Sequence, residues 1–159
     1  MWLLIPFLML CCLSCDERKT EVKLEDGNPP TFVMSGSGNL VEMSIGLEIQ
    51  DKTIKPSKRT PVTWKIVPIN RDGKGVETIG KIKYGIVPEG YRQIIPANGE
   101  PPPRLVPGNY YYYYLETINA PHANGAFEIR DGKAVRAYGV ATCYQIVDGE
   151  EIESDCGDQ

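Results

Sequence analysis

Few residues in this chain have the types and spacing needed for catalysis. The sequence of 159 residues contains a single histidine, His122, in a loop of small and turn-forming residues. No nucleophile lies in a recognisable motif that would pair with it, such as the strained strand-to-helix turn of hydrolases. We therefore interpret His122 as a solvated loop residue and expect a protein that is not an enzyme, with a hydrolase of unknown class as the weaker alternative.

The sequence also lacks the ligand sets of metal and nucleotide sites. One histidine and two cysteines outside the N-terminal segment are too few for a structural zinc site. The acidic run 148–158 lacks the alternating spacing of a calcium-binding loop, and the glycine-containing segment 70–75 lacks the Gly-Lys-Ser/Thr ending of a phosphate-binding loop. We expect no metal and no cofactor.

The charge of the chain bears on its partners. The formal net charge is −4 at pH 7, and six of the last twelve residues are acidic. An acidic protein has no general electrostatic attraction to nucleic acid or to an anionic membrane surface. Nucleic acid is therefore excluded as an expected partner.

Two cysteines outside the N-terminal segment, Cys143 and Cys156, are candidates for a disulfide. A hairpin with a four-residue loop at 148–151 places them opposite each other and also pairs the apolar residues that flank the loop. A two-residue turn would instead set Cys143 against Ser154. Because hydrophobic pairing and the bridge agree, we predict the longer loop and the disulfide, with two free thiols as the alternative.

Five consecutive tyrosines at 110–114 form the strongest candidate for a binding surface. Alternate side chains of a strand face opposite ways, so the apolar Leu115 marks the inward face and Glu116 marks the outward one. The inward set is Tyr111, Tyr113 and Leu115. The outward set, a candidate ligand-binding row for a protein or glycan partner, is Tyr110, Tyr112 and Tyr114. The alternative is that this row packs beneath the prolines at 101–103 or at a sheet edge.

The elements that must position these residues are predicted to be strands. From residue 31 onward, short apolar or alternating runs are separated by Gly, Pro, Asn and Asp, with no long stretch of helical period. The predicted strands are 31–35, 40–49, 62–69, 77–87, 92–95, 109–117, 126–130, 134–138, 142–147 and 152–155. This pattern predicts an all-β domain over residues 31–159, an immunoglobulin-like antiparallel β-sandwich with an extra C-terminal hairpin.

The register of one further hairpin follows from side-chain matching. A two-residue turn at Asp131-Gly132 would set Phe127 opposite Arg136, whereas a three-residue loop at 130–132 sets Phe127 opposite Val135. The longer loop places the large apolar groups on one face. We therefore predict the three-residue loop.

The segment before the tyrosine strand resembles the corner between strands E and F of fibronectin type III domains. The matching residues are Leu105, Pro107, Gly108 and Tyr111, and Trp64 lies about where such domains place a core tryptophan. The resemblance implies an immunoglobulin-like sandwich in which the tyrosine hydroxyl bonds back to the backbone near the corner.

The N-terminus is uncharged over residues 1–14 and too short to form a permanent membrane-spanning helix. The segment ending in Leu13-Ser14-Cys15 resembles a bacterial lipoprotein signal peptide, which implies a lipid on Cys15 and a location in the bacterial cell envelope, facing the periplasm or the exterior. Cys11 and Cys12 are alternative acceptors, and an N-terminal helix packed on the core of a soluble protein is the alternative structure. The charged segment 15–30, ending in Asn-Pro-Pro, is predicted to be a flexible tether.

The segment 82–91, followed by the proline-rich loop and the tyrosine strand, is similar to small uncharacterised bacterial envelope lipoproteins. We expect a membrane-anchored binding or structural module without catalysis, attached to the membrane through its N-terminal lipid. The alternative is an inhibitor or immunity-type lipoprotein that uses the loop 96–103 on an envelope enzyme.

Overall fold

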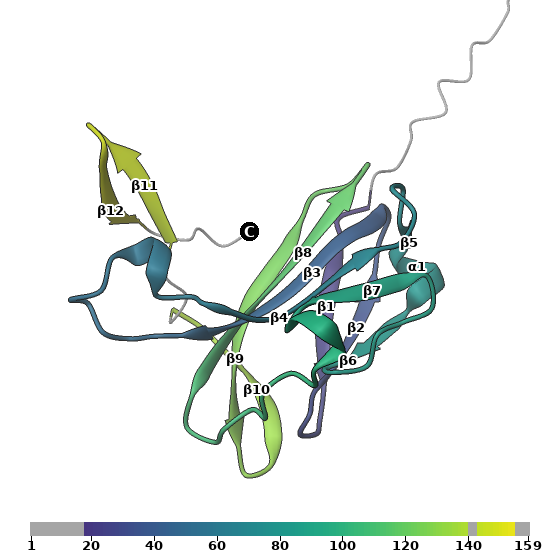
Figure 1. The fold of residues 1–159 in the computed structure, drawn as a ribbon, viewed down its shortest axis with the longest axis horizontal. Helices are drawn as coiled ribbons and strands as arrows, with labels where there is room; N and C mark the ends of the chain where they lie inside the picture. The colour runs from purple at the N-terminus through teal and green to yellow at the C-terminus, as the bar shows by residue number, and fades with distance from the viewer. Residues whose placement is uncertain (1–17, 140–142, 155–159) are drawn as a thin grey trace, which may run out of the picture.

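Two antiparallel sheets pack face to face in this protein, and a separate hairpin projects from them (Figure 1). The computed structural model describes residues 18–139 and 143–154. The smaller packed sheet has the order β1-β2-β6, the larger has the order β10-β9-β8-β3-β4-β7 with β5 beside β3, and β11 pairs with β12. The predicted all-β sandwich with an extra C-terminal hairpin is confirmed.

The strands of the smaller sheet are β1 (Glu21–Glu25), β2 (Thr31–Ser35) and β6 (Lys81–Lys83). Those of the larger sheet are β3 (Asn39–Glu48), β4 (Val62–Pro68), β5 (Lys74–Gly75), β7 (Tyr91–Ile95), β8 (Tyr110–Ile118), β9 (Ala123–Arg130) and β10 (Lys133–Ala137). The hairpin consists of β11 (Cys143–Val147) and β12 (Glu150–Ser154). The helical turns are η1 (Pro56–Lys58), α1 (Val76–Ile79) and η2 (Ala97–Gly99). No helix in the described ranges is long and apolar enough to cross a membrane.

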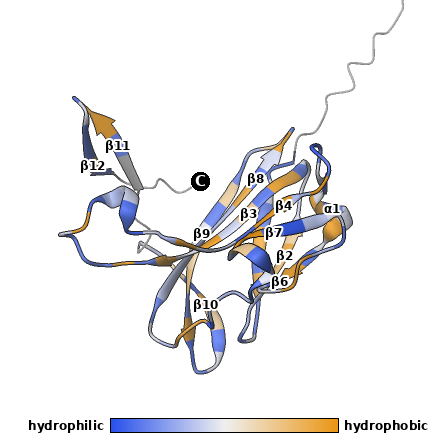
Figure 2. Ribbon diagram, in the orientation of Figure 1, coloured by the Kyte–Doolittle hydropathy of each residue, from blue (hydrophilic) through white to orange (hydrophobic). Residues whose placement is uncertain are grey.

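The core lies between the two packed sheets and is rich in aromatic rings. Phe32 of β2 makes edge contacts with Tyr113 and Phe127 of the larger sheet, with ring centroids 5.5 and 5.8 Å apart. Trp64 is fully buried and lies edge-on to Tyr84. Figure 2 shows apolar and polar residues interspersed along the strands, as expected where each strand gives one face to the core.

The corner before β8 has the contact implied by the fibronectin type III resemblance. The backbone N–H of Val106 donates a hydrogen bond to the Tyr111 hydroxyl oxygen at 2.7 Å. Tyr111 is buried and its ring stacks on Phe127. This link fixes the loop 105–109 to the strand that follows it, as the tyrosine corner does in immunoglobulin-like domains.

Two predicted segments differ from the structure. The segment 15–30 was predicted as a flexible tether, but residues 21–25 form β1, because Val22 and Leu24 alternate with charged residues and pack against the core. The single strand predicted over 77–87 is interrupted: the N–H of Gly80 bonds to the carbonyl of Val76 at 2.8 Å and closes α1 before β6 begins. The predicted signal peptide at 1–14 and Cys15 lie outside the described residues.

The prediction of a three-residue loop between β9 and β10 is wrong. Lys133 pairs with Arg130 and Arg136 pairs with Phe127, so the turn has two residues. Asp131 and Gly132 both have positive φ, 51° and 74°, which is the geometry of a type I′ turn. A type I′ turn matches the right-handed twist of the two strands. This backbone preference outweighs the pairing of large apolar side chains on which the prediction was based.

The four-residue loop predicted for the C-terminal hairpin is also wrong, for the same reason. Asp148 and Gly149 have φ of 52° and 83°, and the register sets Cys143 opposite Ser154. Cys156 lies outside the described residues. The Cys143–Cys156 disulfide therefore stays a prediction, without the support that the longer loop gave it.

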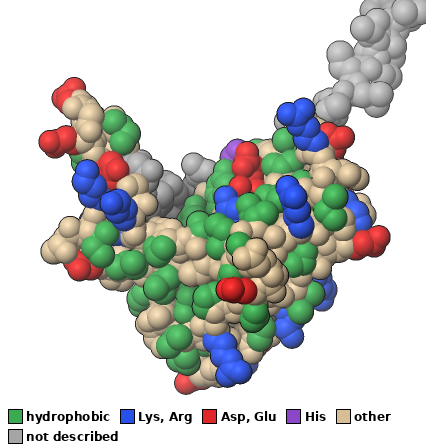
Figure 3. Space-filling model, in the orientation of Figure 1, with side chains coloured by type: hydrophobic (Ala, Val, Ile, Leu, Met, Phe, Trp, Pro, Cys, Tyr) green, Lys and Arg blue, Asp and Glu red, His purple; other side chains and the backbone are tan. Residues whose placement is uncertain are grey.

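Side-chain contacts connect this hairpin to the η1 loop between β3 and β4. Arg59 is buried and pairs with Glu153 of β12 at 2.8 Å. Ser57 donates its hydroxyl to Glu151 at 2.8 Å. Figure 3 shows acidic side chains near the free end of the hairpin and basic ones below them, so opposite charges face each other where the hairpin joins the loop.

Candidate functional site

The tyrosine strand presents the two faces that the sequence predicts. Tyr111, Tyr113 and Leu115 are buried in the core, with relative exposures of 4%, 1% and 0%. The outward members, Tyr110, Tyr112 and Tyr114, are all half-buried on the opposite face of the sheet. The face assignment is therefore confirmed, and the outward row is only partly accessible.

Small residues flank the central outward tyrosine, Tyr112, across the sheet. Tyr112 pairs with Gly46 of β3 and with Ala126 of β9. Burial raises the pKa of the Tyr112 phenol to about 12, with the nearby Tyr114 and Glu48 adding to the shift. The Tyr112 hydroxyl is therefore protonated at neutral pH and offers a hydrogen-bond donor rather than a charge.

The prolines at 101–103 do not lie on the outward tyrosines, contrary to one of the predicted alternatives. The Tyr84 hydroxyl donates to the Pro103 carbonyl at 2.8 Å, and Pro102 approaches Gly85. The prolines instead line a pocket of about 480 Å³ with Asn28, Pro29, Tyr84, Gly85, Arg104 and Leu105. The Tyr84 hydroxyl, one of its polar groups, already has a partner.

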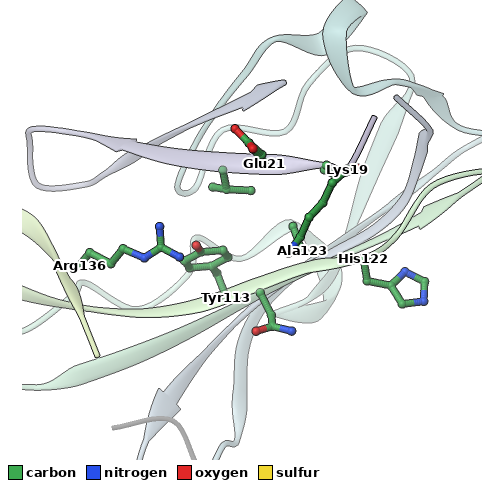
Figure 4. A pocket seen from close by; sticks show the side chains of 9 residues that line it. Lys19, Glu21, Tyr113, His122, Ala123 and Arg136 are labelled. Atoms are coloured by element: carbon green, nitrogen blue, oxygen red, sulfur yellow. The ribbon is translucent and has the colours of Figure 1, made fainter. Parts of the chain in front are cut away.

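A second concave region opens between β1 and the β9–β10 hairpin, and it is the better candidate site (Figure 4). Two cavities, of about 340 and 400 Å³, share Val22, Tyr113 and Arg136. We call the two together the β1/β10 groove. The end toward the start of β9 is lined by Lys19, Thr20, Glu21, His122, Ala123 and Asn124. The other end is lined by Lys23, Leu24, Asp26, Ala134 and Val135.

The groove exists because β10 covers only part of β9. Their pairing ends at Ala126 and Ala137, so the first residues of β9 have no β10 neighbour. The facing strand β1 belongs to the other sheet and packs Val22 and Leu24 inward. The gap between the two sheet edges therefore has an apolar floor and polar rims.

Tyr113 brings a hydroxyl into this groove from a side chain that is 1% exposed. Its ring lies over Gly125, where a Cβ would stand 2.5 Å from the hydroxyl oxygen and 2.7 Å from Cζ. Within the described part of the chain this hydroxyl has no hydrogen-bond partner and is not among the fully buried polar atoms, and Tyr113 lines both cavities. Burial raises its pKa, Arg136 lowers it and Tyr138 raises it, so the phenol is a donor at neutral pH.

Two cations lie on either side of Tyr113. Figure 4 shows the Arg136 guanidinium pointing toward the Tyr113 ring and the Lys19 side chain running down toward Ala123. The guanidinium carbon of Arg136 also lies 5.4 Å from the centroid of Tyr138, within the range of a cation–π contact. Among residues 18–139 and 143–154, neither cation forms an ion pair with a carboxylate.

The carboxylates that line the groove are directed or paired elsewhere. Glu21 points away from Tyr113, on the other side of β1 (Figure 4). Asp26 pairs with Lys133 at 2.9 Å. The part of the groove around Tyr113 is therefore positively charged.

His122 lies at the rim of the groove but is not directed at Tyr113. Its Nδ1 accepts a hydrogen bond from the Thr117 backbone N–H at 3.2 Å, and its ring lies against Tyr114 with centroids 5.7 Å apart. The side chain is exposed, as predicted for a loop residue, yet it is fixed to its own turn. In the described part of the chain, no group of three His, Cys, Asp or Glu side chains is arranged to hold a metal ion.

Sequence reasoning missed this groove and its polar residues Lys19, Tyr113 and Arg136. Tyr113 was predicted to lie in the core. Its ring does so, but the prediction did not include the hydroxyl, which reaches the groove. The structure places Gly125 inside β9, where a glycine is typical of a close approach by another group, but the predicted strand began at residue 126 and so left this signal unread. Comparison with protein-family models, curated proteins and solved structures gives no match for this chain.

Proposed function

We propose that this protein is a binding module without catalysis, held at the bacterial cell envelope by a lipid on Cys15, and that it takes its ligand in the β1/β10 groove. The observation that carries the proposal is the Tyr113 hydroxyl, which opens into the groove without a partner in the described residues although its side chain is almost fully buried. Among the described residues no buried side-chain nitrogen or oxygen lacks a hydrogen-bond partner, so this hydroxyl lies at the surface of the groove, where it can donate to an acceptor on a ligand.

The size and lining of the groove support this proposal. Cavities of about 340 and 400 Å³ lie in the range of small-molecule sites. Such sites combine apolar walls with a few convergent polar groups, and here Val22, Leu24 and Ala134 form the walls while Tyr113 and Arg136 supply the polar groups.

Photo-crosslinking in bacterial cells tests the site. In the full-length protein a benzophenone amino acid replaces Lys23, which is exposed at the groove. In the matched control it replaces the exposed Lys83 of β6. We expect a light-dependent adduct at position 23 and none at 83. Equal adducts at both positions, or no adduct at 23, would overturn the groove as the binding site.

The anchor has its own test. Cys15→Ala removes the acceptor, so the protein should move from the membrane fraction to the soluble fraction, and mass spectrometry of the wild-type protein should recover an acylated Cys15 peptide. Membrane association that survives Cys15→Ala would count against the lipid at this position.

An inhibitor that acts through the loop 96–103 is the second candidate, because the loop is exposed at its tip and held at its base. The Gln93 side-chain amide donates to the carbonyls of Pro96 and Glu100 at 2.9 and 2.7 Å. In that case the benzophenone at exposed Asn98, rather than at Lys23, would capture the partner.

A further inference from the structure

The β1/β10 groove holds a specific set of donors, which limits the chemistry of its ligand. At its centre one phenol and one guanidinium lie side by side, from Tyr113 and Arg136 (Figure 4). A guanidinium presents a planar fork of N–H donors, and a neutral phenol adds one O–H donor. These donors suit the two oxygens of a planar anion.

The charge around these donors has the sign that an anion requires. Arg136 and Lys19 have no ion-pair partner among the described residues, while Asp26 is paired with Lys133 and Glu21 is directed away. The Arg136 guanidinium lies over the Tyr138 ring, a contact that does not neutralise its charge. The cationic charge next to Tyr113 is therefore available to a ligand.

The groove continues from these donors over apolar surface. The cavity that Tyr113 and Arg136 share with Lys23 and Asp26 is also lined by Val22, Leu24 and Ala134. Val22 and Leu24 are partly buried and pack against the core, so their exposed atoms form a floor of aliphatic carbon. A ligand anchored at Arg136 would lay its apolar part along this floor.

We infer that the β1/β10 groove binds a carboxylate that carries an apolar substituent, with the carboxylate on Arg136 and the Tyr113 hydroxyl and the substituent along Val22, Leu24 and Ala134. This inference rests on the proposed function, since it names the ligand class of the same groove. Both a short fatty acid and the C-terminus of a peptide that ends in an apolar residue have this chemistry.

Two probes distinguish these sources. The full-length protein in detergent is titrated with hexanoate and with N-acetylleucine, and binding is followed by NMR chemical shifts or calorimetry. Tighter binding of hexanoate indicates a fatty acid, and tighter binding of N-acetylleucine indicates a peptide terminus. Hexanol, N-acetylleucinamide, acetate and hexyl phosphate are titrated under the same conditions.

We expect at least one of the two carboxylates to bind and its uncharged analogue to bind at least about tenfold more weakly, because a charge-assisted hydrogen bond is lost. Acetate should also be weaker, because it has no apolar substituent. Equal binding of acid and uncharged analogue, or tighter binding of hexyl phosphate, would overturn the assignment of a carboxylate. No binding of either carboxylate would also overturn it.

Variants locate the contact. Arg136→Gln should weaken carboxylate binding about tenfold or more, and Tyr113→Phe about fivefold to tenfold. The matched controls Arg92→Gln and Tyr111→Phe change an exposed arginine of β7 and the corner tyrosine, so they should leave the affinity unchanged. Thermal melting of each variant shows whether it folds. If Arg136→Gln does not fold, Lys19→Gln tests the other cation at the rim of the groove.

The outcomes separate this inference from the proposed function. A light-dependent adduct at Lys23 combined with no carboxylate binding would leave the groove as a site and reject the ligand class. The absence of both would reject both. Carboxylate binding that Arg136→Gln and Tyr113→Phe leave intact would place the carboxylate elsewhere and overturn the inference.

Discussion

The ring of Tyr113 lies across Gly125 of the neighbouring strand, so closely that a Cβ at position 125 would stand 2.5 Å from the tyrosine hydroxyl oxygen. The missing side chain lets an inward-facing tyrosine extend across β9 toward the sheet edge. Its ring then packs in the core, and its hydroxyl lies at the groove. One glycine thus connects the packing of the sandwich to the candidate site.

Gly125→Ala should destabilise the domain by about 1–3 kcal/mol, because the added methyl group would overlap the Tyr113 ring and must displace it from its packed position. The matched control is Gly75→Ala, where a Cβ would meet only ordinary contacts, the nearest at 3.5 Å, and φ is −55°. Denaturant unfolding of both variants measures the difference. Equal changes in the two free energies of unfolding would contradict the close approach at Gly125.

Removing the hydroxyl of Tyr111 or Tyr113 should give different changes in stability. Tyr111→Phe leaves the Val106 N–H without its partner and should cost about 1 kcal/mol. Tyr113→Phe removes a hydroxyl that bonds to no described residue, so the free energy of unfolding should stay within about 0.5 kcal/mol of the wild type. A larger loss for Tyr113→Phe than for Tyr111→Phe would show that the Tyr113 hydroxyl is a structural donor.

Truncation of the tyrosines should follow the two faces of β8. Tyr111→Ala removes a buried ring that stacks on Phe127 and should cost about 3–5 kcal/mol. Tyr114→Ala removes a half-buried ring on the other face and should cost clearly less. Unfolding in urea measures both variants, and similar losses would argue against the assignment of the faces.

Contact between the C-terminal hairpin and the η1 loop should weaken in acid. Hydrogen bonds from Ser57 lower the pKa of Glu151, and the hydrogen bond from Arg59, with the charge of Lys52, lowers the pKa of Glu153. The contact therefore forms with both carboxylates ionised. It is fully present above the ordinary glutamate pKa of 4.5 and is lost as the pH falls through the lowered values.

The Ser57 amide reports this transition, because its N–H donates to Glu151 at 3.1 Å. Its NMR shift or its exchange protection, corrected for intrinsic rates, should be constant from pH 7 to 5 and change below that range. Glu153→Gln should loosen the contact already at pH 7, whereas Glu89→Gln, at a fully exposed site away from the hairpin, should not. A contact that loosens as the pH rises would contradict the carboxylates as its basis.

Local patterns in the sequence determined the fold class, the faces of β8 and the corner at Tyr111. Each depends on residues within a few positions of one another: the two-residue period of a strand fixes which of Leu115 and Glu116 is inward, and Pro107-Gly108 sets the corner. Side-chain matching failed to fix the turns at Asp131-Gly132 and Asp148-Gly149, because the positive φ of those residues set the register.

Only the tertiary structure decided where the groove lies. Lys19 and Arg136 are more than one hundred residues apart and line the same cavity because β1 joins the smaller sheet and β10 ends early on β9. Neither event follows from a local period: the first depends on burial of Val22 and Leu24 against the other sheet, and the second on the register set by a turn. The alternation of the tyrosine strand predicts which rings enter the core. The packing of the two sheets decides that the Tyr113 hydroxyl reaches the groove and can bind a ligand.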